Sequence, residues 1–576
     1  MTDPSSEEVD VLVVGSGAAG LSAALFAAAE GLRVLVVEKT EYVGGTTAYS
    51  AGTCWMPGHI HLADEEAVRD REAGARYLDA LVGSRAPQEL RRRYLEAGPE
   101  MLRRLEALGV RFTRSATVVD YHPELPGAGI GRALEPVPFD GRRLGRAGLR
   151  RVRPPIPEFS LFGGTLMVRR VEADRLLRIF RGSPRAVLLA LRLGVRWVFD
   201  MLRYPRGTRL TMGNALAATL YHRLLEEGGV VQLSSTVKRL VQERGRVVGA
   251  VVEAGGRERR VDVTCGVVLA GGGFAASRHY REAHLPTPTP QFSPAAPGAT
   301  GDSLELGLAV GAVLGDHDDN AFWFPSSIGT RRNGSLAVFP HIWDRAKPGI
   351  IAVGSAGRRF TDESVSYHRF TRAMYAQQRL DDETVPGWLI VDSRSLRRYG
   401  LGMIRPRATS ASIDRRVESG YIHRADTITS LAASIGVDGA GLVASVERNN
   451  RDAAHGEDSE FGKGTSPFGR QYGDPEHRPN ANLGPIERAP FFALPVVPTP
   501  LATAAGLRID TEARVLDVRG DPVPGLYACG NDADSIMAAE YPGAGCQIGA
   551  GLVFGYLAAR DAAREDAARA AVPSSR

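Results

Sequence analysis

A glycine triplet near the amino terminus has the spacing of a nucleotide phosphate site. Residues 9–14 predict a buried parallel strand, Gly15-Ser16-Gly17-Ala18-Ala19-Gly20 follows as GxGxxG, and then come a predicted helix and a second strand that ends at Glu38. In such a βαβ unit the glycines permit a tight turn, close approach to a pyrophosphate and close helix–strand packing. The helix N-terminus faces the phosphates, and the acidic residue accepts hydrogen bonds from ribose hydroxyls. These residues predict dinucleotide binding; the alternative is a glycine-rich turn without a ligand.

A run of small and hydroxyl-bearing residues follows directly. Its candidate cofactor-binding residues are Lys39, Gly44, Gly45, Thr46, Thr47, Ala51 and Gly52. The run resembles the GG(S/T)T…SGG stretch of the fumarate reductase/succinate dehydrogenase flavoprotein superfamily, and this resemblance implies FAD as the dinucleotide. Superfamily members that attach flavin covalently use a histidine in this stretch. None stands between Gly44 and Gly52, so the implied FAD is noncovalent.

Later segments are expected to return to the cofactor in the same resemblance. They contribute Val237, Ala270, Gly271, Gly272, Asp302, Gly530, Asn531 and Ile548. Ala270 to Gly272 end a second buried strand, and Asp302 is expected to cap a helix that starts at the flavin. Ile548 lies in a glycine-rich helix whose N-terminus is expected to face the flavin pyrimidine.

Three tyrosine-bearing segments narrow the resemblance. They read DYHPELPG at 120–127 followed by EP and PFD at 135–140, GRRFTDESVSY at 357–367, and EYPGAG at 540–545. They look like the YHPE…PG…EP.PF loop, the G.RF.NE…Y run and the YPGPG run of the 3-ketosteroid Δ1-dehydrogenases. Asp362, Ala544 and Cys546-Gln547 depart from the family's pattern, and these departures bear on which steroid is bound.

The implied chemistry is removal of two hydrogens from neighbouring carbons beside a ketone. The α proton becomes acidic only if hydrogen-bond donors meet the carbonyl oxygen as charge develops. By the resemblance, Tyr541 and the Gly545 N–H donate to the C3 carbonyl. Tyr367 takes the C2 proton as tyrosinate with Tyr121 hydrogen-bonded to it, and flavin N5 accepts the C1 hydride. A tyrosine pKa is ordinarily about 10, so the base needs help from its surroundings. Each tyrosine also has a simpler interpretation as a packing residue.

The leading hypothesis is an FAD-dependent 3-oxosteroid dehydrogenase that uses an external electron acceptor. One alternative is an oxidoreductase or ene-reductase of the superfamily acting on another ketone or enone. A flavin-holding module without its own substrate is another. A small dicarboxylate is disfavoured, because residues 499–507 hold no histidine and 540–545 hold no arginine. The four cysteines form no CxxC pair, so no metal site is expected.

The motifs predict an α/β fold in which an inserted α+β catalytic domain splits a Rossmann-like FAD-binding domain. The expected parts are 1–315 and 498–576 for FAD binding and 316–497 for the substrate. Residues 87–97 and 99–108 both have helical periodicity, and Gly98-Pro99 is expected to mark a break or a kink between them.

The 576-residue chain carries a net charge of +5, but its positive charge is dispersed. Only four of its 71 lysines and arginines are lysine, and no nucleic-acid partner is expected. The densest basic patch, 184–206, alternates arginines with apolar residues and predicts an amphipathic helix. This helix either contacts a membrane surface peripherally or packs on the FAD domain or a partner subunit. An acidic, polar start and the lack of a long apolar run predict a cytoplasmic protein, with membrane association as the alternative. The oligomeric state stays open.

Overall fold

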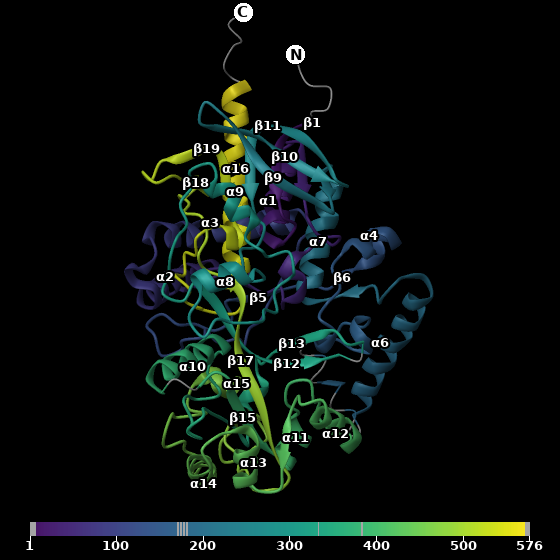
Figure 1. Cartoon of the computed structure of the whole chain (residues 1–576). Helices are drawn as coiled ribbons and strands as arrows, with labels where there is room; N and C mark the ends of the chain where they lie inside the picture. Colours follow the sequence, from purple (N-terminus) through teal and green to yellow (C-terminus); the bar gives the residue numbers. More distant parts are fainter. Residues whose placement is uncertain are drawn as a thin grey trace, which may run out of the picture.

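Two β-sheets, one above the other in Figure 1, organise the chain. The structure is a computed structural model that describes residues 7–570 except 170, 171, 173, 174, 177, 178, 180–182, 332, 382 and 383. The upper part of Figure 1 holds both ends of the described chain, and the lower part is formed by residues from the middle of the sequence. The predicted α/β fold is confirmed.

The upper sheet has eight strands, and its central strands are parallel. The path is β18 (Arg514–Leu516), β19 (Pro522–Ala528), β11 (Arg257–Leu269), β1 (Glu7–Val14), β2 (Val34–Val37) and β8 (Val230–Gln232). A meander of β9 (Ser235–Glu243) and β10 (Arg246–Ala254) joins it along β11. Strand β2, residues 11–13 of β1 and residues 267–269 of β11 are buried runs of valine and leucine, as expected for parallel strands covered on both faces. Their carboxyl ends converge on one edge of the sheet.

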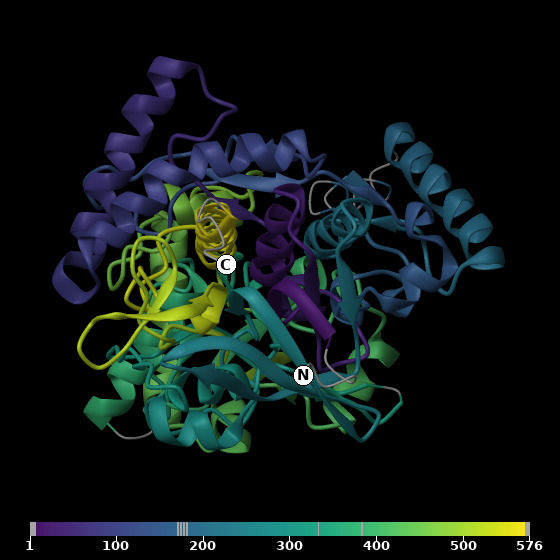
Figure 2. The same ribbon diagram turned by 90° about the horizontal axis from the view of Figure 1, so that it is seen from above.

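Helix α1 (Ala18–Ala29) follows β1 and packs against the long C-terminal helix α16 (Cys546–Ala570), as Figure 2 shows from above. Small residues allow this contact: a Cβ on Gly555 would meet Ser22 Oγ at 2.7 Å and the Ala19 carbonyl at 2.9 Å. The other helices of this part include α2 (Asp64–Val82), α3 (Gln88–Ala107), α4 (Gly145–Arg151), α6 (Pro184–Arg203), α7 (Met212–Glu226), α8 (Arg278–His284) and α9 (Asp302–Leu308). Short strand pairs lie between them: β3 (Cys54–Trp55), β4 (Phe112–Arg114) and β5 (Ala133–Pro136) in one sheet, β6 (Phe139–Asp140) and β7 (Arg209–Leu210) in another.

The lower sheet has six strands. They are β12 (Ala321–Thr330), β13 (Leu336–Pro340), β14 (Ile350–Val353), β15 (Gly387–Asp392), β16 (His423–Ala425) and β17 (Phe491–Thr503). Around it lie α10 (Tyr367–Asp381), α11 (Ser393–Tyr399), α12 (Ser410–Glu418), α13 (Ile428–Ile435), α14 (Gly439–His455) and α15 (Pro467–Tyr472). Strands β12 and β17 pair along the junction of the two parts. The expected boundary between residues 497 and 498 lies inside β17, and the domain division stays a prediction.

The break expected at Gly98-Pro99 and the cap expected at Asp302 are both wrong. The structure has one helix α3 that runs through Pro99. Its inner face is buried, and a Cβ on Gly98 would overlap the Met56 sulfur; tertiary packing therefore outweighs the hydrogen bond that proline removes. Asp302 does not cap α9: Gly301 holds the N-cap position, and Asp302 is the first helical residue.

Candidate active site

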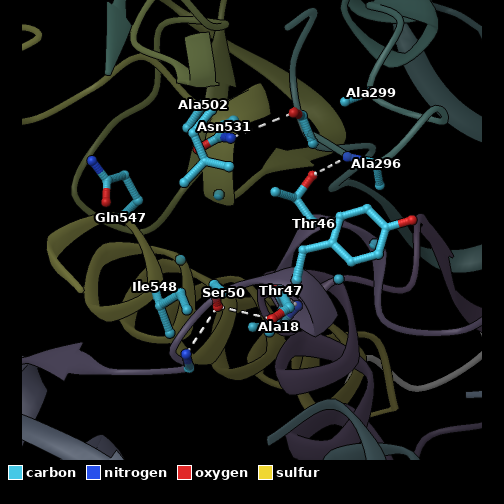
Figure 3. A pocket seen from close by; sticks show the side chains of 18 of the residues that line it. Ala18, Thr46, Thr47, Ser50, Ala296, Ala299, Ala502, Asn531, Gln547 and Ile548 are labelled. Atoms are coloured by element: carbon cyan, nitrogen blue, oxygen red, sulfur yellow. Dashed lines mark hydrogen bonds between the residues drawn. The ribbon is translucent and has the colours of Figure 1, made fainter. Parts of the chain in front are cut away.

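The glycine triplet forms the turn between β1 and α1. Gly15 has φ +102°, and a Cβ there would overlap the Ala270 carbonyl. At Gly17 a Cβ would meet only Thr47 Oγ1, at 3.9 Å, so this backbone faces open space. The Ala18 N–H donates to Thr47 Oγ1 at 3.0 Å (Figure 3). The turn therefore has the shape predicted for close approach of a phosphate group.

Glu38 is fixed from two sides at the end of β2. Its Oε2 accepts bonds from the Ser16 N–H (3.1 Å) and hydroxyl (2.6 Å), and its Oε1 accepts bonds from the Thr40 N–H and hydroxyl. The neighbouring Lys39 pairs with Asp302 at 2.6 Å. This ion pair ties the 38–47 segment to α9 and explains why Asp302 lies at the cavity without capping its helix.

The later glycine segments meet this turn from the opposite side. The Gly273 N–H donates to Asp532 Oδ1 at 2.8 Å, and the Gly271 N–H donates to the other oxygen of this fully buried carboxylate. Asn531 Nδ2 reaches the Gly272 carbonyl at 3.4 Å. Figure 3 shows Asn531 and Gln547 around the same opening as Thr46 and Thr47.

The three predicted tyrosines converge although they lie far apart in the sequence. The hydroxyls of Tyr121 and Tyr367 are 2.8 Å apart. The Tyr541 ring lies 5.1 Å from the Tyr121 ring and 5.2 Å from the Tyr367 ring, measured between centroids. Tyr367 begins α10 and stacks on Phe324 of β12 at 3.9 Å. All three phenols are at most 5% exposed.

Backbone bonds hold two of these tyrosines in register. The Tyr121 N–H donates to the Pro542 carbonyl at 2.9 Å, directly after Tyr541. Tyr77 donates its hydroxyl to the same carbonyl at 2.7 Å. Gly545, with φ +92°, passes so close to Thr53 that a Cβ would overlap the Thr53 carbonyl. The predicted donor segment therefore approaches the cavity through a turn that only glycine fits well.

Burial controls the ionisation of the cluster. It raises the pKa of Tyr121, Tyr367 and Tyr541 well above the ordinary value of 10. A neutral Tyr541 suits a hydrogen-bond donor. For Tyr367 the direction is opposite to what a resting tyrosinate requires. The hydroxyls of Tyr121 and Tyr541 are both hydrogen-bonded to Tyr367, and Tyr121 is the one that can stabilise the phenolate while Tyr541 holds the ketone.

One cavity of about 440 Å³ joins the glycine turn to the tyrosines. All four candidate catalytic residues line it, and so do all candidate cofactor-binding residues except Gly20 and Gly44. These two glycines act behind the wall: a Cβ on Gly20 would overlap the Gly15 carbonyl, and the Gly44 N–H donates to the Ser16 carbonyl.

Sequence reasoning missed much of the apolar wall. The missed lining residues include Val118, Ile156, Phe159, Val168, Phe324, Pro340, Ile342, Trp343, Tyr472 and Leu501. They come from loops, short helices and strands without a shared motif, so no spacing could have marked them. Ser115, Glu135, Arg153, Arg169 and Gln547 add polar groups to the wall.

The cationic side chains of the described wall have partners. Lys39 pairs with Asp302, and Arg169 Nη2 pairs with Glu135 Oε2 at 3.1 Å. Arg153 donates to Thr40 Oγ1 at 2.7 Å. A substrate anion would therefore have to displace Asp302 or Glu135 to reach Lys39 or Arg169. Arg153 differs, because only a neutral hydroxyl holds it and its buried Nε has no hydrogen-bond partner among the described residues.

The cavity fits an FAD molecule. The open backbone at Gly17 and the doubly held carboxylate of Glu38 suit a pyrophosphate and a ribose. Gln547 lines the same cavity, and its side-chain hydrogen bond to Tyr541 places a polar amide where the glycine turn meets the tyrosines. When bound, FAD supplies the hydride acceptor of the reaction.

Comparisons with known proteins agree with this geometry. A family model described as FAD binding domain matches residues 10–548. The chain is 37% identical to 4-oxocyclohex-2-ene-1-carboxylate 5-dehydrogenase of Sinomonas cyclohexanicum, covering 97% of this chain and 94% of that one. It is 36% identical to 3-oxosteroid 1-dehydrogenase of Mycolicibacterium smegmatis, with 98% and 99% covered. The crystal structure of 3-ketosteroid delta1-dehydrogenase from Sterolibacterium denitrificans with 1,4-androstadiene-3,17-dione superimposes with a TM-score of 0.89 at 34% identity, covering 97% and 100%.

Proposed function

The chain belongs to the FAD binding domain family and is an FAD-dependent oxidoreductase acting on CH–CH groups, and on this premise we propose that it desaturates the 1,2 bond of 3-oxosteroids. Tyr541 and the Gly545 N–H hold the ketone oxygen, and Tyr367 removes the C2 proton with help from Tyr121. The observation that carries the proposal is the continuous cavity from the glycine turn to three touching phenols.

The roles follow from the chemistry of each position. The neutral phenol of Tyr541 donates to an oxygen that gains negative charge in the transition state, in a site with little water. Tyr367 touches both other phenols, so a proton taken from the carbon next to the ketone arrives beside the group that polarises that ketone. The 2.8 Å contact lets Tyr121 stabilise the resulting phenolate.

The wall favours a neutral, extended substrate over a small carboxylate. Its apolar members come from the 115–169 segments, from β12, and from residues 340–343 and 501–502, so they surround a long stretch of the substrate. Two of the cations in the described wall, Lys39 and Arg169, are already in ion pairs with carboxylates. The identity to the oxocyclohexenecarboxylate enzyme of S. cyclohexanicum makes a monocyclic ketone the second candidate.

The test is anaerobic flavin reduction by a ketone panel. Holoenzyme is mixed with 3-oxosteroids, with 4-oxocyclohexanecarboxylate and with 4-oxocyclohex-2-ene-1-carboxylate, and the oxidised flavin absorbance is followed while mass spectrometry detects loss of two hydrogens. Steroid bleaching with a 1,2-unsaturated product is the expected result. Bleaching by the monocyclic acids alone would transfer the function to the second candidate, and bleaching by none would refute both. A Tyr541→Phe holoenzyme serves as the control for the roles assigned here.

The same reasoning assigns roles to the two parts of the fold. Residues 1–315 and 498–576 form the FAD-binding part, and residues 316–497 supply Tyr367 and the walls around the ketone. Limited proteolysis of flavin-loaded protein tests this division: cuts are expected near residues 316–320, whereas the continuous strand β17 protects the second boundary.

We also propose that the outer face of α6 contacts an anionic membrane surface. Its exposed apolar residues are Val187, Leu188, Leu191, Val195, Val198, Phe199, Met201 and Leu202. Figures 1 and 2 both place α6 at the edge of the molecule, so packing on the FAD domain covers little of this face. Arg185, Arg192 and Arg203 are exposed along the same helix and complement lipid phosphates. Within the described residues, no helix is both long and apolar enough to cross a bilayer.

The helix is also joined to the cavity wall. Trp197 stacks on Phe162 at 4.6 Å and donates its ring N–H to Thr165 Oγ1 at 3.2 Å. Trp197 thus contacts the 156–169 segment, which contributes Phe159 and Val168 to the cavity wall. A lipophilic substrate dissolved in the membrane would therefore enter near its binding site.

Sedimentation with vesicles tests the contact. Binding to vesicles containing phosphatidylglycerol, and weaker binding by Leu188→Asp/Leu191→Asp protein, is the expected result; Leu336→Asp, on an exposed leucine of β13, is the control. Equal binding by wild type and the double variant would refute the proposal, as would a dimer that dissociates in the double variant while vesicles bind neither protein.

A further inference from the structure

A buried carboxylate directly precedes the proposed donor Tyr541. Glu540 is 5% exposed, and its Oε1 accepts bonds from Arg372 Nη1 at 2.6 Å and from Arg85 Nη1 at 2.7 Å. Arg372 also pairs through Nε with Asp319 at 2.7 Å. Although burial opposes ionisation, the two arginines hold the pKa of Glu540 below its ordinary value. These four side chains form a charged cluster outside the cavity wall.

The cluster joins the segments that carry Tyr367 and Tyr541 to two neighbouring elements of the fold. Arg85 comes from the turn after α2, and Asp319 from the connection into β12. Arg372 lies on α10, five residues after Tyr367, which is about 7.5 Å along the helix axis. One carboxylate thus connects the backbone that carries Tyr541 with the helix that carries Tyr367.

The backbone before Glu540 is strained. Ala538 has φ +47° and Ala539 has φ +62°, and neither residue is glycine. A left-handed conformation brings the Cβ of a non-glycine residue too close to the following carbonyl oxygen and is therefore unfavourable. Such a turn persists only where surrounding contacts hold it, and the Glu540 N–H bond to the Met537 carbonyl (2.8 Å) is joined here by the two arginine bonds.

We propose that Glu540 and Arg372 are positioning residues that hold the strained turn of Tyr541 at a fixed distance from Tyr367. The inference rests on the proposed function, because ketone desaturation needs a donor on the oxygen and a base at the neighbouring carbon at the same time. Neither side chain contacts the cavity, so they act through the tyrosines. A misplacement of about 1 Å at such a site can cost on the order of 100-fold in rate.

The first test is a double-mutant cycle on flavin reduction. Glu540→Gln in flavin-loaded enzyme is expected to lower the rate constant about 10- to 100-fold at saturating ketone, with KM changed less than about threefold. In a Tyr541→Phe background the same change is expected to lower the rate less than about twofold, because the group it positions is already gone. Glu65→Gln, in the exposed Glu65–Arg69 ion pair of α2, is the matched control. An equal effect of Glu540→Gln in both backgrounds would overturn the proposal.

A second variant separates positioning from general loss of stability. Glycine adopts the left-handed conformation of residue 539 without strain. The double variant Glu540→Gln/Ala539→Gly is therefore expected to regain a large part of the rate lost in Glu540→Gln. Its isotope effect with substrate deuterated at C2 is expected to return to the wild-type value. Recovery of the unfolding temperature without recovery of rate or isotope effect would overturn the proposal.

A third readout needs no turnover. Crystal structures of wild-type and Glu540→Gln holoenzymes are expected to differ in the separation of the Tyr367 and Tyr541 hydroxyl oxygens. An unchanged separation would overturn the inference. If no ketone of the panel reduces the flavin of the wild-type enzyme, the proposed function fails. The structural comparison still decides whether Glu540 and Arg372 position the two tyrosines.

Discussion

Removing the Tyr121 hydroxyl perturbs the proposed base without touching the ketone site. In Tyr121→Phe the ring keeps its contacts to Phe468 at 5.0 Å and to Tyr541 at 5.1 Å between centroids. Only the 2.8 Å contact to the Tyr367 hydroxyl is lost. The fold is therefore expected to stay intact, and the change reports on proton transfer.

The size of the effect follows from burial and charge. Burial raises the pKa of Tyr367, so its phenolate depends on protein donors. A hydrogen bond to a charged group is worth about 1.5–3 kcal/mol, which corresponds to about 10- to 150-fold in rate. Because the phenolate becomes harder to form, the rise of the reduction rate with pH is expected to shift to higher pH. KM is expected to stay nearly constant.

Stopped-flow reduction of the flavin measures this directly. Substrate deuterated at C2 is expected to show a larger isotope effect in Tyr121→Phe than in wild type, since proton removal becomes the slower step. Tyr375→Phe removes a comparable buried phenol from α10, bonded to the Pro288 carbonyl at 3.2 Å, and is expected to leave the isotope effect unchanged. A Tyr121→Phe rate within about twofold of wild type with an unchanged isotope effect would refute the assigned role.

Three further perturbations test the cofactor turn, a buried ion cluster and an uncharged histidine. Gly15→Ala places a Cβ on the Ala270 carbonyl and is expected to abolish flavin retention, read from the flavin-to-protein absorbance ratio, whereas Gly31→Ala, also at positive φ but with open space around it, retains flavin. Glu363→Gln removes a fully buried carboxylate that bonds an equally buried arginine at 2.9 and 3.0 Å, and chemical denaturation should show a loss of about 3–5 kcal/mol. His368 is fully buried, and burial lowers its pKa to about 3. Below pH 6.5 the unfolded chain gains a proton at His368 that the folded chain does not, so His368 alone should lower the free energy of unfolding by about 3 kcal/mol from pH 7.5 to 4.5. The total fall should therefore be smaller by about that amount in His368→Gln than in wild type.

Local patterns predicted the parts of the site that a short segment builds by itself. The βαβ unit needs one buried strand, three glycines and a carboxylate within 38 residues, and the structure has all of them in place. The tyrosines could be singled out only through the resemblance of their segments. Their contact spans 246 positions between Tyr121 and Tyr367, a separation that no periodicity encodes.

The features that sequence reasoning missed depend on tertiary packing. Helix α3 continues through Pro99, although proline usually ends a helix, because its inner face is packed. Asp302 pairs with Lys39, which is distant in sequence, and does not cap its own helix. Glu540 carried no signal either: an acid before a tyrosine is ordinary until the fold brings Arg85 and Arg372 to it.

The same distinction explains why similarity alone leaves two ring substrates in competition. The tyrosines and the glycine turn perform chemistry that any ring ketone requires, so they do not discriminate between a steroid and a monocyclic acid. Discrimination falls to the wall, where Phe159, Val168 and Trp343 come from segments without a motif and Arg169 is held by Glu135. If this division holds, freeing Arg169 with Glu135→Gln should raise the affinity for an anionic ketone and leave the intrinsic rate at the tyrosines unchanged. A change in that rate at saturating substrate would mean that the wall and the catalytic phenols are coupled.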